Sequence, residues 1–141
     1  MTMRLRSLKV GDTLPPLAKP PIDRTTLALF AGASNDHNPV HIDIDFARNA
    51  GMDDVFAHGM LVMAYLGQLL TNFAPQDALR RFAVRFGAIT HLGDEITCEG
   101  EVEELLAYHG EPCVRLGIRA RNQLGEIKLS GEAVFALPAA A

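Results

Sequence analysis

Residues 57–73 read AHGMLVMAYLGQLLTNF, and this stretch determines the fold that we predict. Between Met60 and Leu70 only Gln68 is clearly polar, so a helix here leaves no face for water. The apolar run is shorter than the ~20 residues that a membrane span needs, and Gly67 interrupts it. We therefore expect a helix that is enclosed by the rest of the protein.

The start of this helix carries a second signal. The first N–H groups of a helix have no acceptor within it, and they form the positive end of the helix dipole. Here those groups belong to His58 and Gly59, and a polar loop, Asn35 to His41, lies upstream. If that loop reaches the helix start, the chain has a buried polar site there.

Length, charge and cysteine usage narrow the class of protein. The chain has 141 residues, enough for a core of its own, and we predict a single domain over residues 1–141. Lys plus Arg total 13 and Asp plus Glu total 17, so the net charge of −4 argues against a nucleic-acid partner. Cys98 and Cys113 lack metal-ligand spacing, which predicts reduced thiols. Residues 1–12, MTMRLRSLKVGD, contain no apolar signal core, so we expect a cytoplasmic protein without membrane insertion.

The first half of the chain predicts helices joined by loops. Asp23 is suited to cap a helix over residues 24–31, which Gly32 would end. Asp43 is placed to cap a further short helix, and Gly51 would close it. Both predicted helices precede the apolar one.

The second half has the period of strands. Apolar and polar residues alternate in four segments, namely 82–88, 96–102, 114–120 and 127–135. Turn residues at 91–94, 109–110 and 123–125 separate the four segments from one another. Helices followed by antiparallel strands predict an α+β protein. Only the apolar helix has the length for a curved antiparallel sheet to cover, which is the hot-dog fold with one buried central helix.

The polar loop reads ASNDHNPVHID from residue 33. Pro39 favours an extended Asn38 and stiffens the chain between Asp36 and His41. A carboxylate beside an imidazole is an acid/base pair that can deprotonate water, and a nearby helix start can hold a developing oxyanion. Together they suit the addition of water across a double bond conjugated to a carbonyl. From spacing alone, however, the alternative roles stay open: an aspartate such as Asp36 is more often a turn or helix-capping residue, and His41 is alternatively a core histidine with satisfied hydrogen bonds.

Four segments of the chain resemble a known family. The run FAGASNDHNPVH, residues 30–41, resembles the signature of MaoC-like (R)-specific enoyl-CoA hydratases, with its D-x-N-P-x-H core. Residues 57–61 match the second landmark of that family, and residues 84–86 and 93–94 resemble its third strand and the following turn. The chain is also similar to the catalytic subunit of mycobacterial 3-hydroxyacyl-carrier-protein dehydratases. One departure is Asn35, where the family usually has glycine.

The resemblance implies an activity and roles for four residues. Asp36 and His41 would hold a catalytic water and add it to a trans-2-enoyl thioester, giving the (R)-3-hydroxyacyl product. Asn38 would orient the water or the pair, unless it only shapes the turn. The Gly59 N–H would bind the thioester oxygen. No cofactor and no metal are implied.

Five further residues are candidates for substrate binding. Ser34 lies within the signature run, and Met60 packs in the core or lines an acyl tunnel. His58 either contacts substrate or positions Gly59, the second role being favoured. Arg81 and Arg85 belong either to a solvated basic cluster or to a site for coenzyme A phosphates.

The fold also implies partners and leaves two alternative functions. A single sheet keeps an open edge, so we expect a homodimer or a pair with a second hot-dog subunit. The small-molecule partner would be an acyl-CoA or acyl-carrier-protein thioester. The first alternative is a hot-dog thioesterase, which usually has an acidic residue on the central helix, whereas residues 60–70 contain none. The second is a non-catalytic acyl-binding subunit of a heteromeric dehydratase.

Overall fold

The computed structural model describes residues 5–139. Its helices are α2 (Arg24–Ser34), η1 (Pro39–His41), α3 (Ile44–Asn49), α4 (Gly59–Phe73) and η2 (Gln76–Ala78). Its strands are β1 (Leu17–Ala18), β2 (Leu79–Phe86), β3 (Thr97–Tyr108), β4 (Glu111–Arg121) and β5 (Ile127–Ala136). Residues 1–4 and 140–141 of the predicted domain lie outside this description. Within residues 5–139, no helix combines the length and the apolar character needed to cross a membrane.

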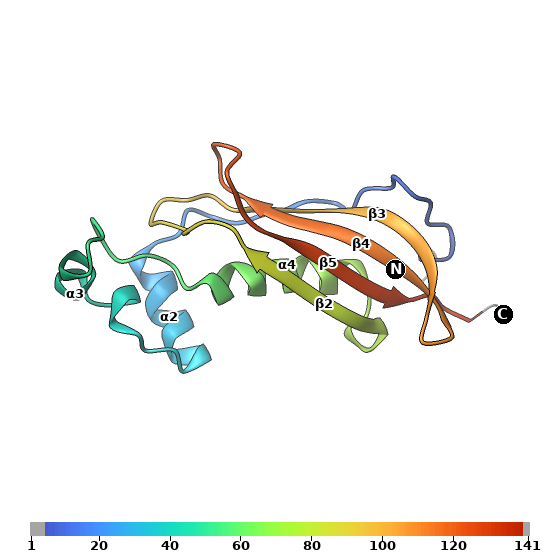
Figure 1. Cartoon of the computed structure of the whole chain (residues 1–141), viewed down its shortest axis with the longest axis horizontal. Helices are drawn as coiled ribbons and strands as arrows, with labels where there is room; N and C mark the ends of the chain where they lie inside the picture. Colours follow the sequence, from blue (N-terminus) through green and yellow to red (C-terminus); the bar gives the residue numbers. More distant parts are fainter. Residues whose placement is uncertain (1–4, 140–141) are drawn as a thin grey trace.

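The five strands form one antiparallel sheet in the order β1-β3-β4-β5-β2. Because β2 and β3 are not neighbours, the chain between them passes across the end of the sheet. Figure 1 shows the sheet curving over α4, with α2 and α3 gathered beyond the end at which α4 begins. This is the predicted hot-dog arrangement.

The core lies between α4 and the inner face of the sheet. Leu66 and Leu70 of α4 are fully buried, as are Leu116 and Ala120 of β4. Burying each leucine side chain contributes about 1.5–3 kcal/mol to folding, so this contact surface dominates the stability of the fold.

The prediction that α4 has no face for water is wrong for the single chain. Met60 is 53% exposed, and Ala64, Gln68 and Thr71 are exposed as well. The spacing of four, four and three residues places them on one face of the helix. One curved sheet covers only one side of a helix, so this face stays open.

The predicted helix starts are confirmed, and one predicted end is wrong. Asp23 caps α2 through a hydrogen bond from the Thr26 N–H at 2.7 Å, and Asp43 caps α3. However, α2 continues past Gly32 to Ser34. A glycine is permitted inside a helix at a cost of about 1 kcal/mol relative to alanine, and here the helix stops only where Asn35 turns left-handed.

The four predicted strands are present, with three local differences. β3 runs on to Tyr108, where His109 and Gly110 form a turn with positive φ angles of 50° and 79°. The alternation over residues 82–88 places Phe86 on the buried face, but it is 56% exposed, because β2 is the edge strand and, within residues 5–139, only the start of α4 lies against its end. At the start of β5 the expected alternation reverses: Ile127 is 36% exposed whereas Lys128 is fully buried.

Candidate active site

Short-range hydrogen bonds fix the loop that carries Asp36. After α2, Asn35 adopts a left-handed φ of 60°, a conformation that asparagine tolerates, so it fits where the family usually has glycine. Asp36 Oδ1 accepts from the Asn38 N–H and Asn38 Oδ1 accepts from the Val40 N–H, both at 3.2 Å. Ser34 Oγ accepts from the Asp36 N–H at 3.2 Å. Asn38 thus shapes the turn, one of its two predicted roles, and Ser34 supports the loop.

The hydrogen bond made by His41 determines which of its nitrogens carries the proton. His41 Nδ1 lies 2.7 Å from the carbonyl oxygen of Phe56. A carbonyl only accepts, so Nδ1–H is the donor, and the lone pair of the neutral ring lies on Nε2. The Phe56 ring packs edge-on against the imidazole, with centroids 5.1 Å apart. His41 is therefore held in an orientation and tautomer suited to a general base.

His58 joins the loop to the start of α4. It is 1% exposed, and its Nε2–H donates to the carbonyl oxygen of Asp36 at 3.1 Å. Its ring stacks on His41 and meets the ring of Phe30 edge-on. Burial lowers the pKa of His58, and the hydrogen bond to Asp36 only partly opposes this, so the ring is neutral at pH 7. Among residues 5–139, His58 Nδ1 is the one buried side-chain nitrogen or oxygen without a hydrogen-bond partner.

A pocket of about 310 Å³ opens at the start of α4. His41 and Gly59 both line it, together with two flanking segments, 56–57 and 86–90. As the first residue of α4, Gly59 offers an N–H without an acceptor inside the helix, at the positive end of the dipole. The Phe86 ring lies against Gly59 so closely that a Cβ there would be 2.8 Å from two ring carbons. The pocket therefore joins an imidazole, an amide donor and an apolar wall.

The cluster of Asp36, His41 and His58 has the residue types of a metal site. One ligand atom of each lies within 4.8 Å of the others. However, each histidine already donates one N–H to a carbonyl, and the two rings stack with their centroids 3.9 Å apart. A metal ion must lie in the plane of each imidazole at about 2.0–2.1 Å from its nitrogen, and stacked rings do not meet this requirement. The geometry favours acid/base chemistry over metal binding.

The structure does not bring every predicted site residue to the pocket: of the predicted catalytic residues, His41 and Gly59 line it, whereas Asp36 and Asn38 do not. Arg81 and Arg85 line a groove of about 1000 Å³ on the outer face of the sheet, and Arg81 pairs there with Glu132 at 2.7 Å. Met60 follows Gly59 in α4 but lies on the exposed face of that helix. Their contacts with substrate stay predictions.

Three contributors to the site went unnoticed in the sequence. Phe56 acts through its carbonyl, and a backbone oxygen gives no residue-type signal. Ile89 and Thr90 line the pocket from the connection between β2 and β3, where no strand or helix pattern places them. Their position depends on how that connection crosses the end of the sheet.

Comparisons with known proteins agree with this geometry. Over residues 9–122 the chain matches the family described as MaoC like domain. An (R)-specific enoyl-CoA hydratase of Aeromonas caviae is 33% identical over 114 residues, which are 79% of this chain and 84% of that protein. A mitochondrial 3-hydroxyacyl-[acyl-carrier-protein] dehydratase of Solanum lycopersicum is 27% identical over 131 residues, or 93% of this chain and 78% of that protein.

A solved structure confirms the predicted fold. The (R)-hydratase from A. caviae involved in PHA biosynthesis superposes with a TM-score of 0.81 at 32% identity, covering 94% of this chain and 99% of that one. The predicted resemblance and the hot-dog fold are both confirmed. The chain belongs to the MaoC-like domain family.

Proposed function

We propose that this protein catalyses the reversible hydration of trans-2-enoyl thioesters to (R)-3-hydroxyacyl thioesters. The observation that carries the proposal is that His41 lies next to Asp36, with one ligand atom of each within 4.8 Å, and also shares a pocket with Gly59 at the start of α4. The names of the relatives, which include both an enoyl-CoA hydratase and a 3-hydroxyacyl dehydratase, support the same reaction in its two directions.

Each group has a role in the proposed reaction. His41 Nε2 accepts a proton from a water that Asp36 holds, and the hydroxide adds to the β-carbon of the enoyl group. Electron density moves onto the thioester oxygen, where the Gly59 N–H stabilises it; one such donor is worth ~3–4 kcal/mol. The Asp36/His41 pair then returns the proton taken from water to the α-carbon, so that H and OH from one water are added and both side chains regain their starting states. No electrons are exchanged, and the reaction needs no cofactor.

The substrate would be a thioester of coenzyme A or of acyl-carrier protein, because relatives are named for each. The pocket between Gly59 and Phe86 would receive the thioester end, and its apolar wall suits an acyl chain. The described residues share one main core cluster, which supports a single domain.

We also propose that the protein forms a homodimer, with a second hot-dog subunit as the alternative partner. Two exposed features support an interface: the open face of α4 and the free edge of β2. A second copy that covered both would complete the enclosure that the apolar sequence of α4 requires.

The test of function is an assay with crotonyl-CoA that follows two signals. A hydratase removes the absorbance of the conjugated enoyl thioester and releases no free thiol. A thioesterase releases thiol, and a non-catalytic subunit changes neither signal. Chiral analysis of the product must give the (R)-3-hydroxy isomer, and the (S) isomer would contradict the proposal.

A further inference from the structure

A fully buried lysine lies close to the active site and has no part in the proposed reaction. Between β4 and β5 the register passes from Ala120 opposite Leu129 to Arg121 opposite Ile127, which leaves Lys128 as the additional residue of a β-bulge. Bulges re-aim a side chain and occur often near active sites. The bulge explains why Lys128 is 0% exposed where simple alternation would turn it outward.

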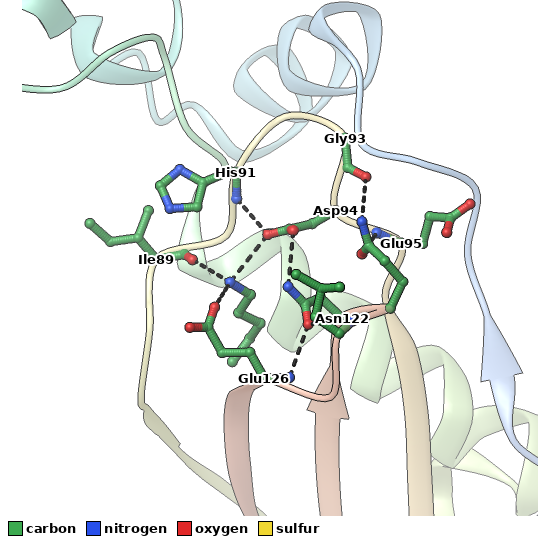
Figure 2. A network of polar contacts seen from close by, with 10 residues as sticks. Ile89, His91, Gly93, Asp94, Glu95, Asn122 and Glu126 are labelled. Carbon is green, nitrogen blue, oxygen red and sulfur yellow. Dashed lines mark hydrogen bonds and ion pairs between the residues drawn. The ribbon is translucent and has the colours of Figure 1, made fainter.

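The ammonium group of Lys128 has a partner for each of its three N–H bonds. Nζ donates to the carbonyl oxygen of Ile89 at 2.7 Å, lies 3.2 Å from Asp94 Oδ2, and forms an ion pair with Glu126. In Figure 2, dashed lines run from the labelled residues Ile89, Asp94 and Glu126 to one nitrogen, which is Nζ of Lys128. The Lys128 ammonium group therefore connects the loop of Ile89 with the turn of Glu126, at the same end of the sheet.

Asp94 extends this network. Its Oδ2 accepts from the His91 N–H at 2.8 Å and its Oδ1 accepts from Asn122 Nδ2 at 3.1 Å, as the dashed lines in Figure 2 show. Burial alone would raise the pKa of Asp94, but the hydrogen bonds from His91, Asn122 and Lys128 outweigh it and hold the pKa below its ordinary value. Asp94 is thus a carboxylate. We refer to Lys128, Asp94 and Asn122 as the Lys128 clamp.

The segment held by the Lys128 clamp is also the wall of the pocket. The Thr90 carbonyl accepts from the Ala57 N–H at 2.8 Å, and His91 forms an isolated β-bridge with Phe56. The Phe56 carbonyl in turn accepts the Nδ1–H of His41. A continuous series of contacts thus leads from the clamp to the acid/base histidine.

Stability alone does not account for the Lys128 clamp. The desolvation free energy of two buried charges offsets most of their electrostatic attraction. Apolar side chains of similar volume commonly stabilise a fold as well as a buried ion pair does, or better. What apolar residues cannot do is hold the irregular backbone of residues 87–91 in one conformation through hydrogen bonds. The clamp therefore contributes placement of that segment.

We propose that the Lys128 clamp positions the active site by fixing the pocket wall and, through Phe56, the tautomer of His41. Its members are positioning residues, because the proposal places none of them in contact with reacting atoms. This inference rests on the proposed function, since it assigns the clamp a role in the same reaction.

The test compares wild type with the double variant Lys128→Met/Asp94→Asn, which removes both buried charges together. We expect kcat with crotonyl-CoA to fall, by up to about 10²-fold, the loss that a 1 Å misplacement can cause, while KM changes little. In ¹⁵N spectra of histidine-labelled protein, His41 should lose its pure Nδ1–H signature, and a His41→Gln variant assigns that signal. Lys128→Gln retains an N–H donor for the Ile89 carbonyl, so its kcat should lie between that of the double variant and that of wild type. If the double variant does not fold, the comparison of Lys128→Gln with wild type provides the test.

The matched control is Arg80→Met/Glu111→Gln, which neutralises an ion pair of 2.8 Å on the same sheet but at the surface. Its kcat and His41 spectrum should equal those of wild type. A folded double variant with unchanged kcat and an unchanged His41 tautomer would overturn the inference. If wild type itself does not hydrate crotonyl-CoA, the proposed function fails, whereas the His41 spectra still test the clamp separately.

Discussion

The imidazole rings of His41 and His58 stack with centroids 3.9 Å apart and planes inclined by 28°. Each donates one N–H to a backbone carbonyl, His41 to Phe56 and His58 to Asp36. The stack therefore ties the acidic loop to the start of α4. Because adjacent cations repel, one ring stays neutral when the other takes a proton, and the buried His58 is the neutral one.

Asp36→Asn should fold like wild type and lose most hydration of crotonyl-CoA. Asp36 is exposed, and asparagine retains an oxygen to accept from the Asn38 N–H, so the loop is kept. Loss of the carboxylate should lower kcat by ~10²–10⁴. The enoyl absorbance assay gives kcat, circular dichroism checks the fold, and Asp53→Asn on an exposed loop is the control. Near-wild-type turnover would remove Asp36 from the mechanism.

Gly59→Ala should impair catalysis by moving Phe86. The new methyl carbon would lie 2.8 Å from two ring carbons, which is too close, so the ring must swing away from the start of α4. The amide donor itself is kept. Phe86→Ala makes room for the methyl group, so kcat/KM of the double variant should be higher than the product of the two single effects predicts. Independent effects would show that the ring does not control access to Gly59.

His58 should make the wild-type protein less stable in acid. Its pKa is lowered in the folded state, so between pH 6.5 and the lower folded value the unfolded chain binds more protons. The stabilisation is present above pH 6.5 and is lost as the pH falls through the folded pKa. His58→Phe keeps an aromatic ring but cannot titrate, so its stability should fall less over that interval. Urea unfolding at a series of pH values measures the difference, and parallel curves would contradict it.

Ala64→Arg should convert a dimer into a monomer. Ala64 lies on the open face of α4, where a charge would be buried without a partner if a second copy covers that face. Sedimentation velocity at micromolar concentration should show a dimer for wild type and for the control Ala33→Arg on the exposed side of α2. A monomeric wild type would contradict the proposed homodimer.

Arg85→Ala and Arg81→Ala test the predicted contact with coenzyme A phosphates. Arg81 already forms an ion pair with Glu132 and is less available to a phosphate. Arg85→Ala should therefore raise the KM for crotonyl-CoA more than Arg81→Ala does. Removing a phosphate contact should also weaken the dependence of KM on salt concentration. An unchanged KM and an unchanged salt dependence in both variants would exclude these two arginines from the substrate site.

Local sequence patterns were sufficient for much of the fold. Helix caps such as Asp23 and Asp43 act through hydrogen bonds within three residues, so the chain near them specifies the helix start. The alternation in 114–120 likewise predicts β4, because the sheet is buried on one face there. The patterns failed at Phe86 and Lys128, where an open sheet edge and a β-bulge decide which side chain is covered.

The sequence by itself determined the apolar helix of residues 60–70, the alternating strands and a loop with Asp36 and His41 on a stiffened backbone. Only the tertiary structure decided that His41 donates to the Phe56 carbonyl, that His58 donates to the Asp36 carbonyl, and that Lys128 is buried against Asp94. The physical reason is the separation along the chain of the residues that interact. Periodicity and capping depend on neighbours along the chain, whereas the tautomer of a histidine and the burial of a charge depend on partners that the fold brings from 15 to 34 residues away.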